Sequence, residues 1–463
     1  MKKRRSSISL IILFVSLVVW AGSLFASPDT SLPRSTLLGI VPEQNQPGSP
    51  VTLQQVIKNS TAAALGLQQG DVITHLNDQT IADFPSLLNA IRPLKPDAPV
   101  QVQIKRKGTH LTLAGKMQPR PYETSKYAKV LYESVKYPGN HLRSIVYQPT
   151  SLTSAQKAPA ILFIQGYTCD SIDYGLLPDV TTRQMIDQFA EAGYVVYRIE
   201  KPGVGDSVSE RPCQQINFSE EAQAFVQGLK ALKGKDYVDP ENVYIFGHSL
   251  GVLHAPVVAS QEPVRGIIGY GGVYKQWYEY MLDIYQKQTV KHWGTSPEQA
   301  KRTTRRLQPL LDAWLNTDKP WQEILNDPQL QQAINSNMIS VDGDLVISRH
   351  YSFFRDINQI DFASLWKTLN IPVLMMHGSL DIQAIEPQWA FDLADQTGHA
   401  SSQAMVLEGA EHAFMRFESK QQHMKVQRSG QYNPGNPQQR FDPRVGQHTL
   451  DWIAKIQGDS GKP

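Results

Sequence analysis

The first part of the chain, residues 34–118, alternates short strand patterns with brief helical ones. Val100–Ile104 alternates apolar and polar residues strictly, as a half-buried strand does, and Phe84–Ile91 has the spacing of an amphipathic helix. The other expected elements are the strands Leu37–Val41, Val51–Ile57 and Val72–Leu76 and the short helix Thr61–Leu65. This pattern predicts a small α+β unit.

The second part, residues 124–463, repeats an apolar strand followed by a helical run. Uninterrupted apolar strands are typical of a parallel sheet that is buried on both faces. They are Ala160–Ile164, Tyr194–Ile199, Val243–Phe246, Gly266–Tyr270, Pro372–Met376 and Ala404–Leu407, and the helical runs include Thr182–Ala192, Glu220–Leu232 and Leu253–Ser260. Ala128–Tyr137 and Leu142–Tyr147 are predicted as an opening antiparallel pair of short strands. The pattern predicts an α/β fold with an eight-stranded, mostly parallel sheet.

Two stretches of the second part depart from this pattern. Residues 274–366 are helical, rich in Gln and aromatic residues, and too long for one crossover helix. A low-complexity loop, residues 430–439, precedes a final helix at Gly446–Ile456.

The amino terminus has the layout of a secretory signal peptide. A charged start, Met1–Arg5, precedes the apolar run Ile8–Ala21 and then small residues, so cleavage is expected after Ala26. We therefore expect residues 1–26 to be removed and the protein to be periplasmic or extracellular. The alternative is an uncleaved membrane anchor at residues 8–26, which would be the protein's only link to a membrane.

Composition narrows the class of protein further. The 463 residues are 41% hydrophobic and 19% charged, which excludes a disordered or fibrous chain. The net charge of +2 gives no reason to expect nucleic acid as a partner. Two cysteines are too few for a disulfide scaffold or a four-thiolate zinc site, and the turn Gly203–Gly205 lacks the Lys of a phosphate-binding loop. No metal and no cofactor are expected.

The strongest chemical signal is Gly247-His248-Ser249-Leu250-Gly251, a G-x-S-x-G that follows an apolar strand and enters a helical run. This is the context that a nucleophile elbow requires, because the turn lifts the serine above the sheet. Together with the strand order, the motif resembles the α/β-hydrolase superfamily. The resemblance implies that Ser249 is the nucleophile and that residues 274–366 form a cap between the sixth and seventh strands.

In that family an acid and then a histidine follow the nucleophile along the chain. Asp381, after the seventh strand, and His412, after the eighth, match these positions. Glu386 is the competing acid. His248 and His254 flank the serine and are expected to pack against the sheet rather than to act in catalysis.

The same resemblance places an oxyanion hole at two backbone N–H groups. One belongs to Leu250, and the other is expected at Tyr167, in a loop where many relatives have His-Gly and this chain has Gln165-Gly166. Cys169 in this loop and Cys213 in the loop after the neighbouring strand would be adjacent in the fold. A disulfide between them is expected in an oxidising compartment, and two free thiols are the alternative.

The stretch from Ala63 to Ile73 and the surrounding order of elements resemble a PDZ domain. The resemblance implies capture of an extended C-terminal peptide by strand addition. The carboxylate-binding loop would be Leu37, Leu38, Gly39 and Ile40, next to an inserted stretch at Pro42–Pro50. The alternative is a PDZ fold that serves as a structural brace.

Taken together, the sequence predicts an exported serine hydrolase that cleaves carboxylic esters or related acyl bonds of a small-molecule or peptide substrate through an acyl-serine intermediate. A serine peptidase of the same fold is the alternative, because a PDZ domain could recruit polypeptides. A non-catalytic adaptor is a third reading.

Overall fold

The computed structural model describes residues 32–43, 48–153, 156–336, 338–429, 432 and 440–459. The predicted signal peptide, residues 1–26, lies outside these residues, as does the alternative anchor at residues 8–26. Within the described ranges, no helix combines the length and apolar character needed to cross a bilayer.

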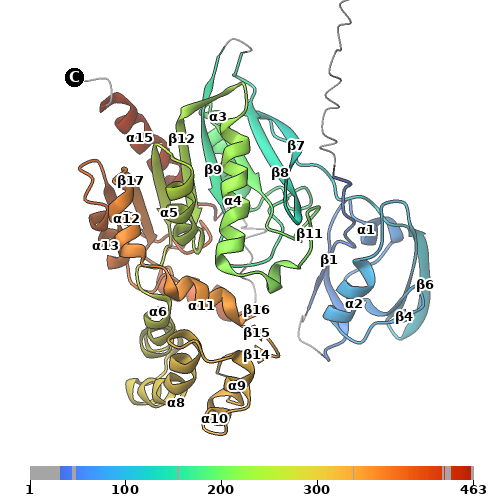
Figure 1. Ribbon diagram of the computed structural model, residues 1–463. Coiled ribbons are helices and arrows are strands. Elements are labelled where there is room, and N and C mark those ends of the chain that lie inside the picture. The colour runs from blue at the N-terminus through green and yellow to red at the C-terminus, as the bar shows by residue number, and fades with distance from the viewer. Residues whose placement is uncertain are drawn as a thin grey trace, which may run out of the picture.

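The first unit is a small antiparallel sheet with two helices (Figure 1). The strand order is β1-β2-β3-β5-β6, and β4 pairs with β3. The strands are β1 (Ile40–Pro42), β2 (Val51–Val56), β3 (Val72–Leu76), β4 (Gln79–Thr80), β5 (Pro99–Arg106) and β6 (Thr109–Lys116), and the helices are α1 (Thr61–Leu65) and α2 (Phe84–Ile91). The expected strand from Leu37 begins only at Ile40, because Gly39 has a φ of 81° and ends an irregular loop.

Local capping explains where both helices of this unit begin. The Ser60 side chain accepts a hydrogen bond from the Ala63 N–H at the start of α1. Asp83 and Ser86 form a reciprocal capping box at the start of α2. The alternating strand β5 buries Val100, Val102 and Ile104 in the core, as its pattern predicts.

The second unit is built on a larger mixed sheet in the order β11-β8-β10-β9-β12-β13-β17-β18, with β7 paired to β8 (Figure 1). Strand β8 pairs antiparallel with both β7 and β10. Neighbouring strands along the path β10-β9-β12-β13-β17-β18 pair in parallel. The bounds are β7 (Ala128–Tyr137), β8 (Asn140–Pro149), β9 (Ala158–Ile164), β10 (Val195–Ile199), β11 (Val208–Ser209), β12 (Val238–His248), β13 (Gly266–Tyr270), β17 (Val373–Gly378) and β18 (Gln403–Leu407). The predicted eight-stranded, mostly parallel sheet is confirmed. Two details were wrong: the opening strands have 10 residues each rather than being short, and β11 is an added edge strand.

Helices cover both faces of this sheet, because successive side chains of a buried strand point to opposite sides. On β12, Ile245 belongs to the core under α4 and α5, whereas Phe246 belongs to the core under α3 and α15. The helices on the first face are α4 (Phe218–Lys233), α5 (Gly251–Gln261), α12 (Phe362–Leu369) and α13 (Gln388–Gln396), and those on the second are α3 (Thr181–Glu191) and α15 (Arg444–Asp459). The short helices η1 (Cys213–Gln215) and α14 (Lys420–Arg428) lie in loops beyond strand ends.

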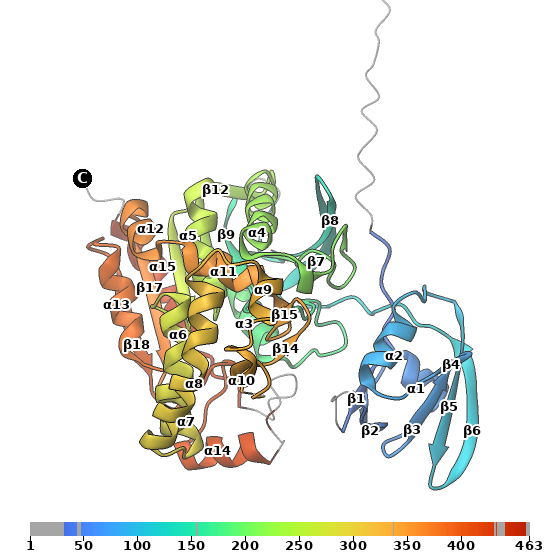
Figure 2. The ribbon, with the colours of Figure 1, turned by 60° about the horizontal axis from the view of Figure 1, so that its bottom comes forward.

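The insertion between β13 and β17 is a mostly helical cap (Figure 2). Its buried residues, among them Trp314, are continuous with the core on the α4 and α5 face. The elements are α6 (Trp277–Asp283), η2 (Ile284–Gln288), α7 (Thr289–Trp293), α8 (Pro297–Leu315), α9 (Trp321–Leu325), α10 (Gln331–Ile334), β14 (Val341–Asp342), β15 (Leu345–Val346), β16 (Arg349–His350) and α11 (Tyr351–Gln359). Strands β14 to β16 form a small antiparallel sheet that the sequence did not suggest.

The two units are joined where the chain enters and leaves the first one. Thr36 and Pro119 are antiparallel bridge partners, so the two ends of the first unit lie side by side. Arg34, which the sequence placed at the start of that unit, makes its ion pairs with the second unit: its Nη1 lies 2.6 Å from Asp206 Oδ2 and 2.7 Å from Asp173 Oδ2.

Candidate active site

Ser249 sits on a sharp turn between β12 and α5. Its φ of 56° is in the left-handed region, which costs a non-glycine residue about 1–2 kcal/mol. Gly247 and Gly251 make the turn possible, since a Cβ on Gly247 would stand 2.5 Å from Gly251 O, and one on Gly251 would stand 2.3 Å from Ile164 O. The spacing of the motif therefore reflects two close backbone approaches around a strained serine.

Asp381 and His412 meet at the carboxyl ends of β17 and β18. His412 Nδ1 lies 2.7 Å from Asp381 Oδ2. The other carboxylate oxygen of Asp381 accepts hydrogen bonds from the N–H groups of Gln383 and Ala384, which fixes the orientation of the carboxylate. Glu386, the competing acid, lies beside Lys291 instead, with 3.5 Å between Oε2 and Nζ.

The charge state of this pair suits a general base. Burial disfavours the imidazolium, but the charge of Asp381 and its hydrogen bond outweigh burial and raise the pKa of His412. Burial likewise works against the charged form of Asp381, yet His412 holds the pKa of that carboxyl well below its usual range. With Nδ1–H donated to Asp381, the neutral ring leaves Nε2 free to accept a proton.

Of the two histidines that flank the serine, His254 is buried and His248 is half-buried. His248 Nε2 donates a hydrogen bond to His412 O over 2.8 Å and so supports the loop that carries His412. Burial lowers the pKa of His248 to about 3, which keeps its ring neutral. His254 lies in a buried polar cluster behind the elbow, described below.

The loop after β9 lies against Ser249. A Cβ on Gly166 would stand 3.0 Å from Ser249 Cβ and 3.4 Å from Ser249 Oγ, so a glycine lets the loop come this close without displacing the serine. Within the described ranges, the backbone N–H groups of Tyr167 and Leu250 have no acceptor. These are the two groups that the sequence nominates as oxyanion donors.

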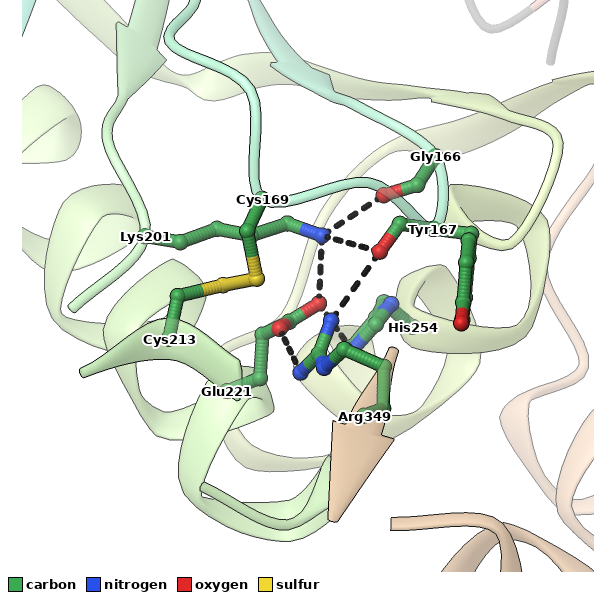
Figure 3. Close-up of a disulfide and its surroundings, with 8 residues drawn as sticks. All are labelled: Gly166, Tyr167, Cys169, Lys201, Cys213, Glu221, His254 and Arg349. Atoms are coloured by element: carbon green, nitrogen blue, oxygen red, sulfur yellow. Dashed lines mark hydrogen bonds and ion pairs between the residues drawn. A yellow bond between two sulfur atoms is a disulfide. The ribbon is translucent and has the colours of Figure 1, made fainter. Parts of the chain in front are cut away.

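Cys169 and Cys213 are joined by a disulfide, with their Cα atoms 5.9 Å apart (Figure 3). The bond connects the loop that carries Tyr167 to η1. Beside it lies a buried cluster that the sequence analysis missed, formed by Lys201, Glu221, His254 and Arg349. Two charged residues in succession after a buried strand, Glu200 and Lys201, were the one available signal.

A series of aromatic rings in the cap and its surroundings connects two loops. One is the loop after β9 that carries Tyr167, residues 165–169, which we call the Tyr167 loop, and the other is the loop after β17 that carries Asp381. Neighbouring ring centroids lie 5.0–6.1 Å apart. We call this series the aromatic row; its members, in order, are Tyr167, Phe354, Trp277, Tyr280 and Trp389. Tyr280 OH donates to Gln383 O, two residues from Asp381. Among the residues that the structure describes, no group of His, Cys, Asp and Glu side chains could hold a metal ion.

A second candidate site lies in the first unit, at the loop formed by Leu37, Leu38, Gly39 and Ile40. A Cβ on Gly39 would overlap the Ser60 side chain, and the φ of 81° also favours glycine. The carbonyls of Leu38 and Gly39 accept from Ala62 N–H and Ile57 N–H, which anchors the loop. The adjoining β1 is the terminal strand of its sheet, so none of the described strands pairs with its outer edge.

Comparisons with known proteins agree with this architecture. Residues 36–116 match the model of the PDZ domain, and residues 180–420 match the family model described as serine aminopeptidase, S33. Esterase EstD of Thermotoga maritima is 22% identical over 298 residues, which are 64% of this chain and 62% of the esterase. The chain thus spans less than two thirds of the length of that curated relative.

Two solved structures are similar over most of their own length. Est1E from Butyrivibrio proteoclasticus has a TM-score of 0.42 at 15% identity and covers 70% of this chain and 99% of its own. A soluble variant of monoglyceride lipase from Saccharomyces cerevisiae, in complex with a substrate analogue, has a TM-score of 0.42 at 16% identity and covers 73% and 99%.

Proposed function

Because the chain belongs to the serine aminopeptidase S33 family of α/β-hydrolases and carries a PDZ domain, we propose that it is an exported serine hydrolase that cleaves carboxylic esters. The observation that carries this proposal is the 2.7 Å contact between Asp381 and His412 near a nucleophile elbow that holds Ser249 at a φ of 56°. The similarity to Esterase EstD favours an ester as the substrate.

The reaction follows from the roles of these three side chains. Ser249 Oγ attacks the ester carbonyl carbon while His412 Nε2 takes the hydroxyl proton, and Asp381 stabilises the imidazolium. The N–H groups of Tyr167 and Leu250 donate to the oxyanion. The intermediate collapses to an acyl-Ser249 as the alcohol leaves with the proton from His412. Water, deprotonated by His412, then releases the acid and restores the serine.

The aromatic row suggests which part of a substrate the cap would contact. Tyr167 and Tyr280 are half-buried and keep part of their ring surface accessible. Phe354 and Trp277 are almost fully buried and pack against these two rings. Such a surface favours an apolar acyl or alkyl group over a charged one. We therefore propose esters with an apolar group next to the scissile bond.

Export is proposed on two grounds. The N-terminal residues 1–26 have the layout of a signal peptide, and the Cys169–Cys213 disulfide is a bond that persists in oxidising compartments. We propose a periplasmic or extracellular location, with retention on the membrane by residues 8–26 as the alternative. Fractionation of cells, with mass spectrometry of the mature N-terminus, distinguishes the two.

Peptide hydrolysis is the second candidate. It is favoured by the family description and by the PDZ domain, whose loop at Leu38 and Gly39 could hold the C-terminal carboxylate of a peptide while β1 pairs with its backbone. A panel of p-nitrophenyl esters and aminoacyl amides on the purified protein compares the two activities directly.

The nucleophile assignment is tested by Ser249→Ala. We expect a loss of at least about 10⁴-fold in kcat, because a triad member is removed, with folding unchanged. Ser260→Ala is the matched control, since Ser260 is an exposed serine near the end of α5, the helix that follows the turn, and its hydroxyl donates to Val257 O. The proposal is wrong if Ser249→Ala keeps more than about a tenth of the activity, or if a fluorophosphonate probe labels another residue.

A further inference from the structure

Three charged side chains meet in the interior behind the Tyr167 loop (Figure 3). Lys201 and Glu221 are 0% exposed and Arg349 is 1% exposed. They come from three separate parts of the fold: the loop after β10, helix α4 and strand β16 of the cap. Because burying charges costs several kcal/mol each unless they are well paired, such a cluster requires specific partners.

Glu221 lies between the two cations. Its Oε1 is 2.8 Å from Lys201 Nζ, and its Oε2 is 2.5 Å from Arg349 Nη2. Burial alone would raise the pKa of Glu221, but the charges of Lys201 and Arg349 outweigh it and bring the value to about 2. Burial lowers the pKa of the adjacent His254 to about 3, so that ring is neutral. The cluster therefore has two positive charges and one negative charge.

Each of the two cations also donates to the loop beside the candidate nucleophile. Lys201 Nζ donates to Gly166 O over 2.7 Å and to Tyr167 O over 3.3 Å. Arg349 Nη1 donates to Tyr167 O over 3.0 Å. Two successive carbonyl groups of the loop thus point into the cationic cluster.

The direction of the Gly166 carbonyl determines the direction of the candidate oxyanion donor. Gly166 C=O and Tyr167 N–H belong to one planar trans peptide, in which the oxygen and the hydrogen point to opposite sides. With Gly166 O held on Lys201, the Tyr167 N–H points away from the cluster. Gly166 itself lies against Ser249, so this N–H is presented on the side where the oxyanion would form.

We propose that Lys201 and Arg349 are positioning residues for the oxyanion hole, and that the cap completes the hole through Arg349. The proposal rests on the proposed serine hydrolase activity. Neither side chain touches the substrate. Lys201 holds the carbonyl of the peptide that carries the Tyr167 N–H, and Arg349 holds the carbonyl of the next peptide, so Tyr167 is fixed on both sides. Glu221 holds both cations in place. The cap thereby contributes to the chemical step as well as to substrate contact.

The test compares two arginines of the cap. Arg349→Met removes the bond to Tyr167 O, whereas Arg355→Met removes bonds from Arg355 to Trp314 O and Lys319 O, both within the cap. Since removal of an oxyanion donor costs about 10²–10³-fold in kcat, we expect misalignment in Arg349→Met to cost about 10–100-fold on a p-nitrophenyl ester. KM should change little, and Arg355→Met should keep the wild-type kcat.

A transition-state analogue separates positioning from a general loss of stability. A boronic acid that forms a tetrahedral adduct on Ser249 should bind Arg349→Met more weakly by the same factor as kcat falls, because both depend on the hole. Lower thermal stability with unchanged kcat and boronate affinity would mean that Arg349 is only structural, and would overturn the proposal.

Further variants keep the test decisive if Arg349→Met does not fold. Lys201→Met removes the hydrogen bond to Gly166 O and should lower kcat. Arg349→Lys retains the charge but loses the two-armed contact, so its kcat should lie between those of wild type and Lys201→Met. Folded Arg349→Lys and Lys201→Met with wild-type kcat would refute the positioning role while leaving the hydrolase assignment intact. A wild-type protein that neither hydrolyses esters nor reacts with a fluorophosphonate at Ser249 would instead refute the proposed function itself.

Discussion

At Ser249, local strain is held in place by close packing. The left-handed backbone at this serine costs about 1–2 kcal/mol, and it persists because Gly247 and Gly251 let neighbouring backbone come within contact distances that a side chain would block. His412 is held in a similar way: Asp381 bonds its Nδ1, and His248 bonds its carbonyl oxygen. The orientation of each side chain therefore depends on the residues packed against it or bonded to it.

The pH dependence of hydrolysis should report His412. Its pKa is raised above the ordinary histidine value of 6.5, because Asp381 outweighs burial. Only the neutral ring can accept the serine proton, so kcat/KM should rise with pH, with a midpoint above 6.5. The same shift stabilises the fold below the unfolded pKa, and this contribution is lost as pH rises through the folded value.

Asp381→Asn supplies the comparison for that profile. The neutral amide no longer raises the pKa of His412, so the midpoint should move to lower pH, and kcat should fall by about 10⁴-fold because the tautomer is no longer fixed. Glu386→Gln, at the acid beside Lys291, is the matched control and should leave the profile unchanged. A midpoint that stays in place in Asp381→Asn would contradict the assignment of Asp381 as the partner of His412.

The parallel strands bring the candidate chemistry to one edge of the sheet. Each part of the candidate site follows one parallel strand: the Tyr167 loop follows β9, Ser249 follows β12, Asp381 follows β17 and His412 follows β18. The carboxyl ends of parallel strands share an edge of the sheet. The loops at this edge must be held in place for the side chains to keep their positions. The Tyr167 loop is fixed twice, by the Cys169–Cys213 disulfide and by the hydrogen bonds from Lys201 and Arg349.

Removal of the disulfide should lower stability more than activity. The bond closes a loop of 44 residues, for which the chain-entropy model gives about 4 kcal/mol, so Cys169→Ser with Cys213→Ser should lower the free energy of unfolding by about 2–4 kcal/mol. Turnover of small esters by the folded enzyme should be largely retained, since Lys201 and Arg349 still hold the carbonyls. Urea unfolding and ester kinetics measure the two effects.

Reductant provides the control for this prediction. Dithiothreitol should shift the unfolding midpoint of the wild type toward that of the double variant and leave the double variant unchanged. Free, alkylatable thiols in the exported wild-type protein would contradict the pairing.

For the whole molecule, the connection between the PDZ domain and the hydrolase is more specific than a flexible linker. Arg34 precedes residues 36–116, the range matched to the PDZ domain, and its side chain forms ion pairs with Asp173 and Asp206 of the hydrolase. Behind the domain, Arg120 donates to Ser171, two residues after Cys169. Both ends of the PDZ domain are thus bound near the segment that follows the Tyr167 loop.

The recruitment role of the PDZ domain can be tested by excising residues 37–118. A short Gly/Ser linker can join Thr36 to Pro119, because these residues are bridge partners, and Arg34 then keeps its ion pairs. We expect turnover of small esters to be retained and action on a substrate with a free C-terminal peptide to be weakened, since only the latter needs the groove. Steady-state kinetics on both substrates measure the difference.

Arg34→Met in the full chain is the companion variant. It keeps the peptide groove but leaves Asp173 and Asp206 short of a buried cation, so it should lower the free energy of unfolding by about 3–5 kcal/mol without selective loss of the peptide-bearing substrate. If excision destabilises the hydrolase and the full-length protein binds no C-terminal peptide, the PDZ domain is a structural brace.

The sequence by itself determined the features that rest on local pattern. Uninterrupted apolar runs located the parallel strands along the chain, and the G-x-S-x-G context located the turn at Ser249. Helix α2 was predicted with its observed bounds because its spacing and its capping residues agree. Strand β6 was not predicted, since its alternation is limited to Leu111 and Leu113 and most of its side chains are exposed. The sequence also left Glu386 open as the acid.

Only the tertiary structure decided which distant residues meet. It brings Asp381 rather than Glu386 to His412, and it places Arg349, far along the chain in the cap, on the carbonyl of Tyr167. Nothing local marks Arg349, because its partners Tyr167 and Glu221 lie in the loop after β9 and in α4. A charged residue in a two-residue strand of the cap is normally expected to be exposed. Burial and pairing of such a residue depend on the packing of the cap against the sheet, which no short stretch of sequence contains.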